Sequence, residues 1–325
     1  MIAATTRLAL GCLLFASLEG SVARAQSPQS VSLRIDNDAF DFWRQPYNRP
    51  DEEYTSGVHI TFDGAVAPWW WWSFASRGAL CTYHMQDCRA ARAEVGQDIY
   101  TPSASVNNPR PTAGSRANGG WLYFSDGARS LHPTRSDELT IALGVTGPPS
   151  LARLTQRIAH AWLPEFNRPT DWSRQIRFEP GAIVSYEHRR RVLAYSAGSL
   201  GVDVLPSLSL KAGNVTTSAA ANLDTRLGWN LPHPWLPERV PFSVAVTTGV
   251  SARAVARDIF LDGNTLRPEY RVGHEPVVES GQLGVEVRVS ILSLSYRAVS
   301  ESRAYAAGPA WHPWGSIVGR VTFDR

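Results

Sequence analysis

The residues with the clearest capacity for chemistry lie where two alternating polar and apolar segments meet, near the start of the chain. Asn37 and Asp38 end the first segment, and Thr55 lies at the start of the second. If the segments are antiparallel strands joined by one connection, these side chains meet on one rim of a sheet. Amide, carboxylate and hydroxyl oxygens are the ligands that a hard cation prefers. The alternative is that they only cap a loop, which the motif alone does not exclude.

A further candidate, His160, lies in a segment that breaks the strand pattern. Residues 150–163 carry apolar side chains three or four positions apart, which predicts an amphipathic helix with Ser150 as its N-cap and Pro164 beyond its end. The apolar positions are Leu151, Leu154, Ile158 and Trp162. The opposite face carries His160 and Gln156, one turn apart. A neutral imidazole can accept a proton from water as the water attacks an ester.

The elements that must position these residues are strands. Period-two alternation recurs from Ser30 to the C-terminus and indicates about twelve strands. The alternations lie near 31–35, 58–62, 94–100, 121–123, 139–143, 183–188, 192–204, 219–229, 242–254, 281–289, 291–298 and 317–323. An even number of strands joined in sequence is typical of a closed up-and-down barrel. We therefore predict an all-β fold, a closed antiparallel transmembrane β-barrel with a short helix in an extracellular loop.

The connections between these strands predict which end of the barrel faces outward. The connections at 38–54, 101–118 and 146–178 are long, and long loops in such barrels are external. With the N-terminus in the periplasm, this places Asn37, Asp38, Thr55, Ser103 and the helix of His160 at the external rim. The connector at 65–90 is an exception because it falls on the periplasmic side. Its run Trp69 to Trp72 favours an interfacial aromatic girdle, with a binding platform as the alternative.

The start of the chain predicts export. Arg7, an apolar run from Leu8 to Leu18 and the small residues around Arg24 are typical of a signal peptide over residues 1–25, which leaves the barrel domain as 26–325. In an oxidising compartment we expect Cys81 and Cys88 to form a disulfide. We predict a location in the outer membrane, with the candidate site facing the extracellular side.

Charge argues against one class of partner. Without the leader the formal net charge falls from +3 to +2, since Arg7, Arg24 and Glu19 are removed. A nearly neutral chain has little electrostatic reason to bind nucleic acid, and we expect none. Lys211 is the only lysine among 32 basic residues. Arginine suits phosphate, such as that of lipopolysaccharide, although a codon bias toward arginine explains this usage more simply.

Six short motifs, densest between residues 30 and 180, resemble the outer-membrane lipid A 3'-O-deacylases. The motifs are Asn37-Asp38, Tyr54-Thr55-x-Gly57, Gln97-Asp98-Ile99-Tyr100-Thr101-Pro102, Gly144-Val145-Thr146-Gly147-Pro148, Gln156-x3-His160 and Trp172-x2-Gln175. Beyond residue 180 the chain resembles this family only in its pattern of barrel strands. The resemblance implies a twelve-stranded esterase that uses Ca²⁺ to hydrolyse the 3'-linked acyloxyacyl ester of lipid A, and a monomer is expected.

The resemblance also implies roles for single residues. His160 matches the histidine proposed to activate water, and Asp38 matches a calcium-binding carboxylate. Asn37 and Thr55 match polar residues needed at the same site, both for catalysis and as metal ligands. Glu165 matches an acidic residue beyond the histidine and is a further candidate ligand. Ser103 lies nearby, but no Gly-x-Ser-x-Gly elbow surrounds it, so an acyl-enzyme is the less favoured mechanism.

One departure from the family keeps other functions open. Family members carry a lysine in the loop after the third strand, where this chain offers Arg110, and a guanidinium is not equivalent to an ammonium. The chain could therefore be a weak or inactive barrel that binds lipopolysaccharide or serves a structural role. A second alternative is an outer-membrane phospholipase, because calcium, histidine and an ester at a membrane surface would serve either lipid.

Overall fold

The computed structural model is a closed barrel, and it describes residues 29–42, 51–64, 81, 87–105, 108–162, 171–267 and 269–323. The barrel strands are β1 (Gln29–Asn37), β2 (Glu53–Gly64), β3 (Cys88–Thr101), β6 (Gly119–His132), β7 (Arg135–Thr146), β8 (Pro180–Arg190), β10 (Leu200–Gly213), β11 (Thr216–Trp229), β12 (Phe242–Asp258), β13 (Val277–Val289), β14 (Leu292–Ser302) and β15 (Trp311–Phe323). The sheet closes because β15 pairs antiparallel with β1, and every other neighbouring pair is also antiparallel. The predicted fold is confirmed.

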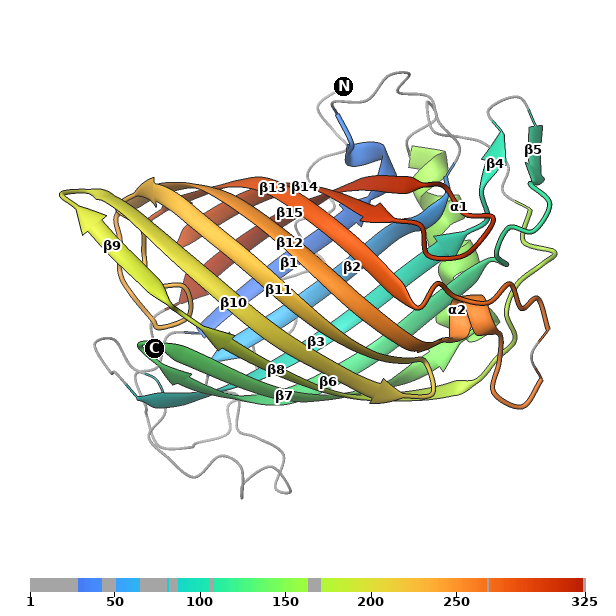
Figure 1. Cartoon of the computed structure of the whole chain (residues 1–325), viewed down its shortest axis with the longest axis horizontal. Helices are drawn as coiled ribbons and strands as arrows, with labels where there is room; N and C mark the ends of the chain where they lie inside the picture. The colour runs from blue at the N-terminus through green and yellow to red at the C-terminus, as the bar shows by residue number, and fades with distance from the viewer. Residues whose placement is uncertain are drawn as a thin grey trace.

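One predicted strand was wrong in its extent. The segment 192–204, expected as a single strand, turns at Gly198 and divides between β9 (Leu193–Ala197) and the start of β10. Gly198 has a φ of +61°, a conformation that glycine adopts without steric cost. β10 pairs with β8 along one part of its length and with β9 along the other part. The hairpin of β9 and β10 therefore extends the barrel wall at one end (Figure 1).

The alternation predicted from sequence separates a lipid-facing surface from a polar interior. Leu33, Ile60, Val95, Phe124 and Leu143 are register partners across five strands, and they are 40–60% exposed. A row of exposed apolar side chains across neighbouring strands is what the outer surface of a membrane barrel requires. We call the lipid-facing apolar surface of the barrel, of which this row is a part, the apolar belt.

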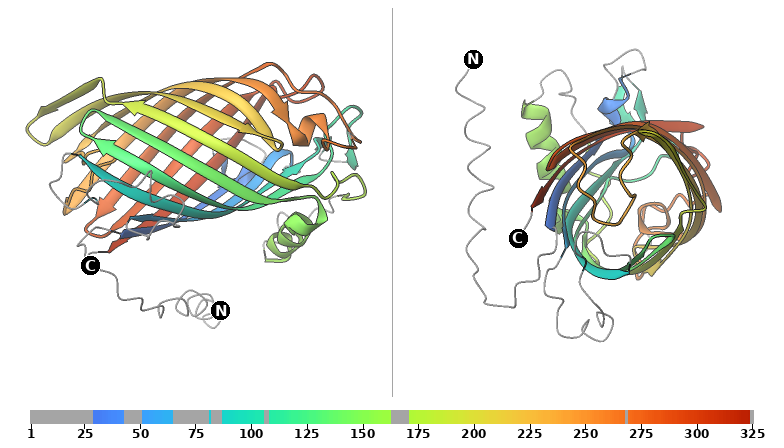
Figure 2. Two further views of the ribbon diagram at one scale, coloured as in Figure 1. Left: turned by 90° about the horizontal axis from the view of Figure 1, so that it is seen from below. Right: turned by 90° about the vertical axis from the view of Figure 1, so that its left-hand side faces the viewer.

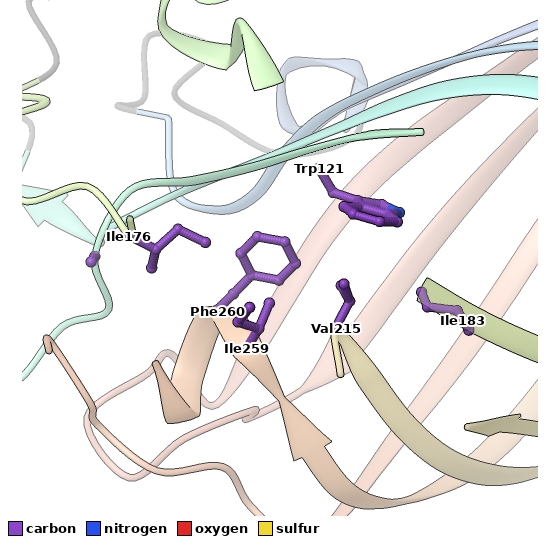
Figure 3. Close-up of a cluster of buried hydrophobic side chains, with 7 residues drawn as sticks. Trp121, Ile176, Ile183, Val215, Ile259 and Phe260 are labelled. Atoms are coloured by element: carbon purple, nitrogen blue, oxygen red, sulfur yellow. The ribbon is translucent and has the colours of Figure 1, made fainter. Parts of the chain in front are cut away.

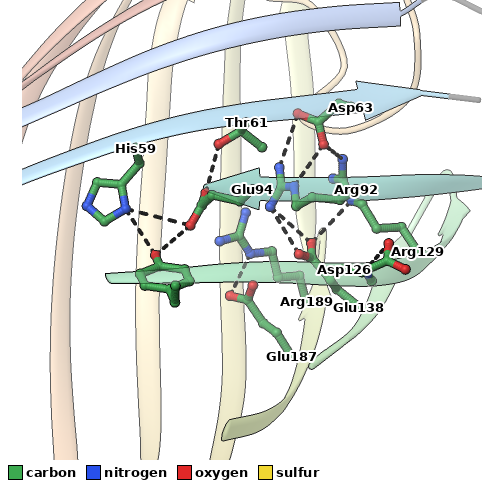
Figure 4. Close-up of polar contacts among 12 residues, drawn as sticks. His59, Thr61, Asp63, Arg92, Glu94, Asp126, Arg129, Glu138, Glu187 and Arg189 are labelled. Carbon is green, nitrogen blue, oxygen red and sulfur yellow. Dashed lines mark hydrogen bonds and ion pairs between the residues drawn. The ribbon is translucent and has the colours of Figure 1, made fainter. Parts of the chain in front are cut away.

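The interior of the barrel is held by ion pairs. Arg92 donates to Asp63 at 2.8 Å and to Glu138 at 3.1 Å, and Arg129 pairs with the same two carboxylates (Figure 4). Further along the wall, His59 lies 3.2 Å from Asp98. Some of these pairs join consecutive strands, whereas Arg92–Glu138 and Arg129–Asp63 join strands that are not consecutive, so paired charges line the lumen face of the wall.

An apolar cluster lies at each end of the barrel. At the end that carries the long connections, Phe260 of α2 (Ile259–Asp262) packs against Trp121 and Ile176 (Figure 3). At the other end, Trp235 packs on the disulfide between Cys81 and Cys88, which confirms the predicted pairing. Short turns near residues 133–134 and 290–291 lie at this second end, as does the end of β15, so we assign it to the periplasm.

The helix that carries His160 lies outside the barrel. α1 (Ala152–Trp162) runs along the outer surface of the wall at the external end, and both views in Figure 2 show it outside the ring of strands. The described helices include none with the length and apolar character needed to cross a membrane. A 3-10 turn, η3 (Pro148–Ser150), precedes α1.

The predicted N-cap of this helix was wrong. Ser150 lies within the 3-10 turn, where its hydroxyl donates to the Gly147 carbonyl at 2.6 Å. Leu151 follows with a φ of +59°, in the left-handed region, and the α-helix begins after it. The chain therefore reverses at Leu151 before the helix starts, which brings α1 back onto the wall.

Candidate functional site at the external end of the wall

The first part of the site is the end of β1. Asp36 is 2% exposed and points into the lumen, so the next residue, Asn37, points to the outer surface. The Asn37 side chain accepts a hydrogen bond from the Ala39 backbone N–H at 2.8 Å and so caps η1 (Asp38–Phe40). Asp38 begins that turn, and its Oδ2 accepts the Glu52 N–H at 3.0 Å. The end of β1 is thereby tied to the approach to β2.

A β-bulge places Thr55 on the same surface. The register between β2 and β3 shifts between Tyr54 and Ser56, so Thr55 is the extra residue. Its hydroxyl lies 2.7 Å from that of Thr101, and both side chains are buried. Thr101 follows Ile99 by two positions, and Ile99 packs under Ala152 of α1. Thr55 and Thr101 therefore lie on the outer surface near the helix rather than in the lumen.

Tyr54 anchors this bulge from the lumen side. Its hydroxyl donates to Asp36 at 2.8 Å and contacts Asp98 at 3.2 Å. A Cβ at Gly57 would collide with that hydroxyl and with the His59 ring. The glycine in the Tyr54-Thr55-x-Gly57 motif is therefore explained by the close approach of Tyr54 across the lumen face.

The second part of the site is the inner face of α1. His160 Nε2 lies 2.9 Å from Asp51 Oδ2, and the two side chains are 14% and 16% exposed. Gln156, one turn earlier, also donates to Asp51 Oδ2 and accepts from Trp172 Nε1 at 2.7 Å. Trp172 thus fixes Gln156, and Gln156 and His160 together hold Asp51.

Asp51 is a candidate site residue that the sequence analysis missed. It lies in the connection between β1 and β2, with no periodic element to show its direction. The Gln156-x3-His160 spacing does predict one shared face, but it does not identify the carboxylate that the face receives. Only the folding of this external connection against α1 brings Asp51 to the histidine.

Acidic side chains concentrate around Asp38. Burial, together with the negative charge of Asp51, raises the pKa of the Asp38 carboxyl well above its usual value, and Glu52 and Asp41 act in the same direction. Among the described residues no three His, Cys, Asp or Glu side chains are close enough to bind a metal ion by themselves. A cation here would need backbone carbonyl oxygens, amide oxygens or water in addition to Asp38.

The structure places the other predicted residues differently. Ser103 donates to Glu53 Oε1 at 2.7 Å, and Glu53 also binds Tyr305 and Arg116, so Ser103 belongs to a separate cluster at the strand ends. Arg110 lies in β5 (Asn108–Pro111), but its side chain is outside the described part of the structure. The described part also does not include Glu165, Trp69–Trp72 or the predicted leader.

The only lysine of the chain is not available to replace the family lysine. Lys211 is in β10 and lines a cavity of about 460 Å³ in the lumen, together with Arg34 and Arg297. The candidate site lies on the opposite side of the wall. A permanently charged side-chain cation at the site would therefore have to come from an arginine.

A glycine in the wall allows α1 to lie close to the strands. A Cβ at Gly120 in β6 would collide with Ser150 Oγ and Ala152 Cβ. We expect Gly120→Ala to push the helix outward and to lower any activity that depends on His160 by about 10²-fold, because small displacements of a catalytic group have large effects. Activity assays on folded protein would measure this.

Gly281→Ala is the matched control for that prediction. Gly281 is also a strand glycine, in β13, and a Cβ there would meet nothing within 4 Å. It should behave as the unchanged protein does. Equal activity of both glycine variants would show that the close seating of α1 is unimportant.

Together these observations define a class: an outer-membrane β-barrel that carries a polar site with a histidine, a carboxylate and hydroxyl groups on the outer surface of its external end. The family model described as outer membrane protein LpxR matches residues 8–323, and the chain belongs to this family. No curated protein sequence matches this chain.

A comparison with solved structures supports the fold. LpxR from Salmonella typhimurium is similar over 90% of this chain and 100% of its own, with 17% identity and a TM-score of 0.72. The β domain of the Bordetella autotransporter BrkA covers 91% of this chain and 99% of its own, with 10% identity and a TM-score of only 0.46. The first comparison supports the same barrel, whereas the second is too distant to support an argument.

Proposed function

We propose that this protein is an esterase that removes the 3'-linked acyloxyacyl chain of lipid A in the outer leaflet. The observation that carries the proposal is the His160–Asp51 pair, held under α1 on the outer surface of the wall, at the same external end of the barrel as Asn37, Asp38 and Thr55. Membership of the LpxR family supports lipid A as the substrate. A site on the outer surface is reached from the membrane, where an acylated lipid resides.

His160 is the proposed general base. When Nε2 donates its hydrogen to Asp51, the lone pair of the neutral ring is on Nδ1. The carboxylate fixes the tautomer and orientation of the ring and stabilises the imidazolium that forms when water is deprotonated. Such a base typically contributes 10²–10⁴-fold to the rate.

Asp38 and its neighbours fit a hard divalent cation. The carboxylate is partly buried, and the neighbouring acidic groups repel it, so a positive charge there would relieve the repulsion. We propose that Ca²⁺ is held by Asp38, with further oxygen ligands from Asn37, Thr55, backbone carbonyls or water. Glu165 remains a candidate ligand. When bound, the cation would supply positive charge toward the oxyanion that develops on the ester carbonyl.

The proposed reaction balances without a protein nucleophile. Water adds to the ester carbonyl carbon while His160 takes one of its protons. The tetrahedral intermediate then loses the sugar oxygen as the bond between that oxygen and the carbonyl carbon breaks. The imidazolium returns the proton to the departing oxygen. The products are the free acyloxyacyl acid and lipid A with a 3'-hydroxyl group.

Mass spectrometry of lipid A tests this function directly. Lipid A would be extracted from cells that express the protein and from cells that carry the empty vector. We expect the mass of the 3'-acyloxyacyl chain to be lost only when the protein is present. An unchanged spectrum with correctly inserted protein would support an inactive barrel, and release of fatty acid from phospholipids alone would support a phospholipase.

A further inference from the structure

The outer face of α1 is apolar and is not covered by the barrel. Leu151, Leu154 and Ile158 are 50%, 48% and 51% exposed. The buried positions of the helix are Ala152 and Gln156, which face the wall. The helix therefore turns its polar side inward, toward the site, and its apolar side outward. This is the reverse of the usual arrangement for a helix packed on a soluble protein.

This outer face lies at the external edge of the apolar belt of the barrel. The wall residues under α1 are Ile99 of β3 and Gly120 of β6. The belt residues of the same two strands, Val95 and Phe124, are each four positions nearer the periplasm, which is about 13 Å along a strand. The helix thus lies at the external border of the lipid-facing surface, on its outer side (Figure 2).

Basic residues accompany the apolar ones. Arg153 and Arg157 are both exposed and follow each other by one turn of α1. A helix with apolar residues on one side and arginines beside them is typical of a segment that lies in a membrane interface, with guanidinium groups at the level of lipid phosphates.

We propose that α1 is a membrane-seated lid: its face of Leu154 and Ile158, together with Leu151 directly before the helix, is inserted in the outer leaflet, and its opposite face holds His160 over the wall. The occupant of the apolar face is lipid. The apolar belt next to the helix faces lipid, which favours lipid rather than a second copy of the chain as the partner of this face. The proposed insertion depends on the fold and on the outer-membrane location of the protein. A test of the insertion is therefore independent of the proposed esterase activity.

The consequence for the site is a direction of access. A lipid in the outer leaflet would contact the outer face of α1 and the belt at the same time, and it would enter between the helix and the wall. If the protein is the proposed esterase, the acyl chain need not leave the bilayer before its ester reaches His160.

Depth-dependent fluorescence quenching tests the insertion without any activity measurement. Leu154→Cys and Ile158→Cys variants of residues 26–325, which lack Cys12, would each be labelled with an environment-sensitive dye and reconstituted in vesicles with brominated acyl chains. Cys81 and Cys88 are joined in a disulfide and would not react. Leu266→Cys is the matched control, because Leu266 is 91% exposed and lies in another external connection.

We expect brominated chains to quench the dyes at 154 and 158 at least twofold more than the dye at 266. Equal, weak quenching at all three positions would overturn the proposal. Blue-shifted emission at 154 and 158 that depends on protein concentration and not on bromine would assign the face to a second copy, and would also overturn it. Two label positions guard against one variant that fails to fold.

Discussion

Replacement of His160 by alanine should lower the rate of lipid A deacylation by about 10²–10⁴-fold, the usual contribution of a general base. The expectation follows from the position of the imidazole, 2.9 Å from Asp51 and on the face of α1 that is turned to the wall. The measurement is the release of the acyloxyacyl chain from purified lipid A by folded protein. Persistence of the heat-modifiable barrel on gels would show that the fold is intact.

The barrel offers a matched control for this experiment. His188 forms a second His–Asp pair, with Nδ1 2.7 Å from Asp137, near the turn at the periplasmic end. His188→Ala removes the same kind of side chain from the same kind of pair, and its activity should stay within about twofold of the unchanged protein. Full activity of folded His160→Ala protein would eliminate His160 as the base.

Loss of the carboxylate at position 38 should have the second large effect. Asp38→Asn keeps the size of the side chain and its ability to accept the Glu52 N–H, but it removes the charge that would hold a cation. We expect activity to fall by about 10²–10³-fold, as when one element of oxyanion stabilisation is lost. The measurement is the deacylation rate as a function of added Ca²⁺.

Chelation provides the independent test of the same idea. Excess chelator should suppress the unchanged protein, and added Ca²⁺ should restore it, whereas the Asp38→Asn protein should respond to neither at ordinary concentrations. Asp171→Asn is the control, because Asp171 is an exposed external carboxylate that accepts the Ser173 N–H at 2.8 Å. Unchanged activity in chelator would remove the metal from the mechanism.

Much of the fold could be predicted because the information is local. Alternation along each strand reports which side chains face lipid, and the count of alternations gave the closed barrel that the structure confirms. The disulfide was also predictable from the two cysteines that follow the predicted leader. The turn at Gly198 was missed because apolar residues continue on both sides of it, so the period-two pattern does not reveal the reversal.

Some features of the candidate site could likewise be predicted from the sequence, and others could not. Asn37, Asp38, Thr55 and His160 could be named because strand ends and a helical period place them at one end of the barrel. Ser103 could be placed at that end, but its partnership with Glu53 depends on loops that fold together only in three dimensions.

By itself, the sequence determined the strands, the external end at which the polar residues gather, and the helical face shared by Gln156 and His160, because each depends on spacing along the chain. Only the tertiary structure decided that α1 lies outside the wall with its polar face inward, and that Asp51 meets His160. Helical amphipathicity identifies two faces but not their surroundings. In a barrel the solvent for the apolar face is lipid, so that face can turn away from the protein.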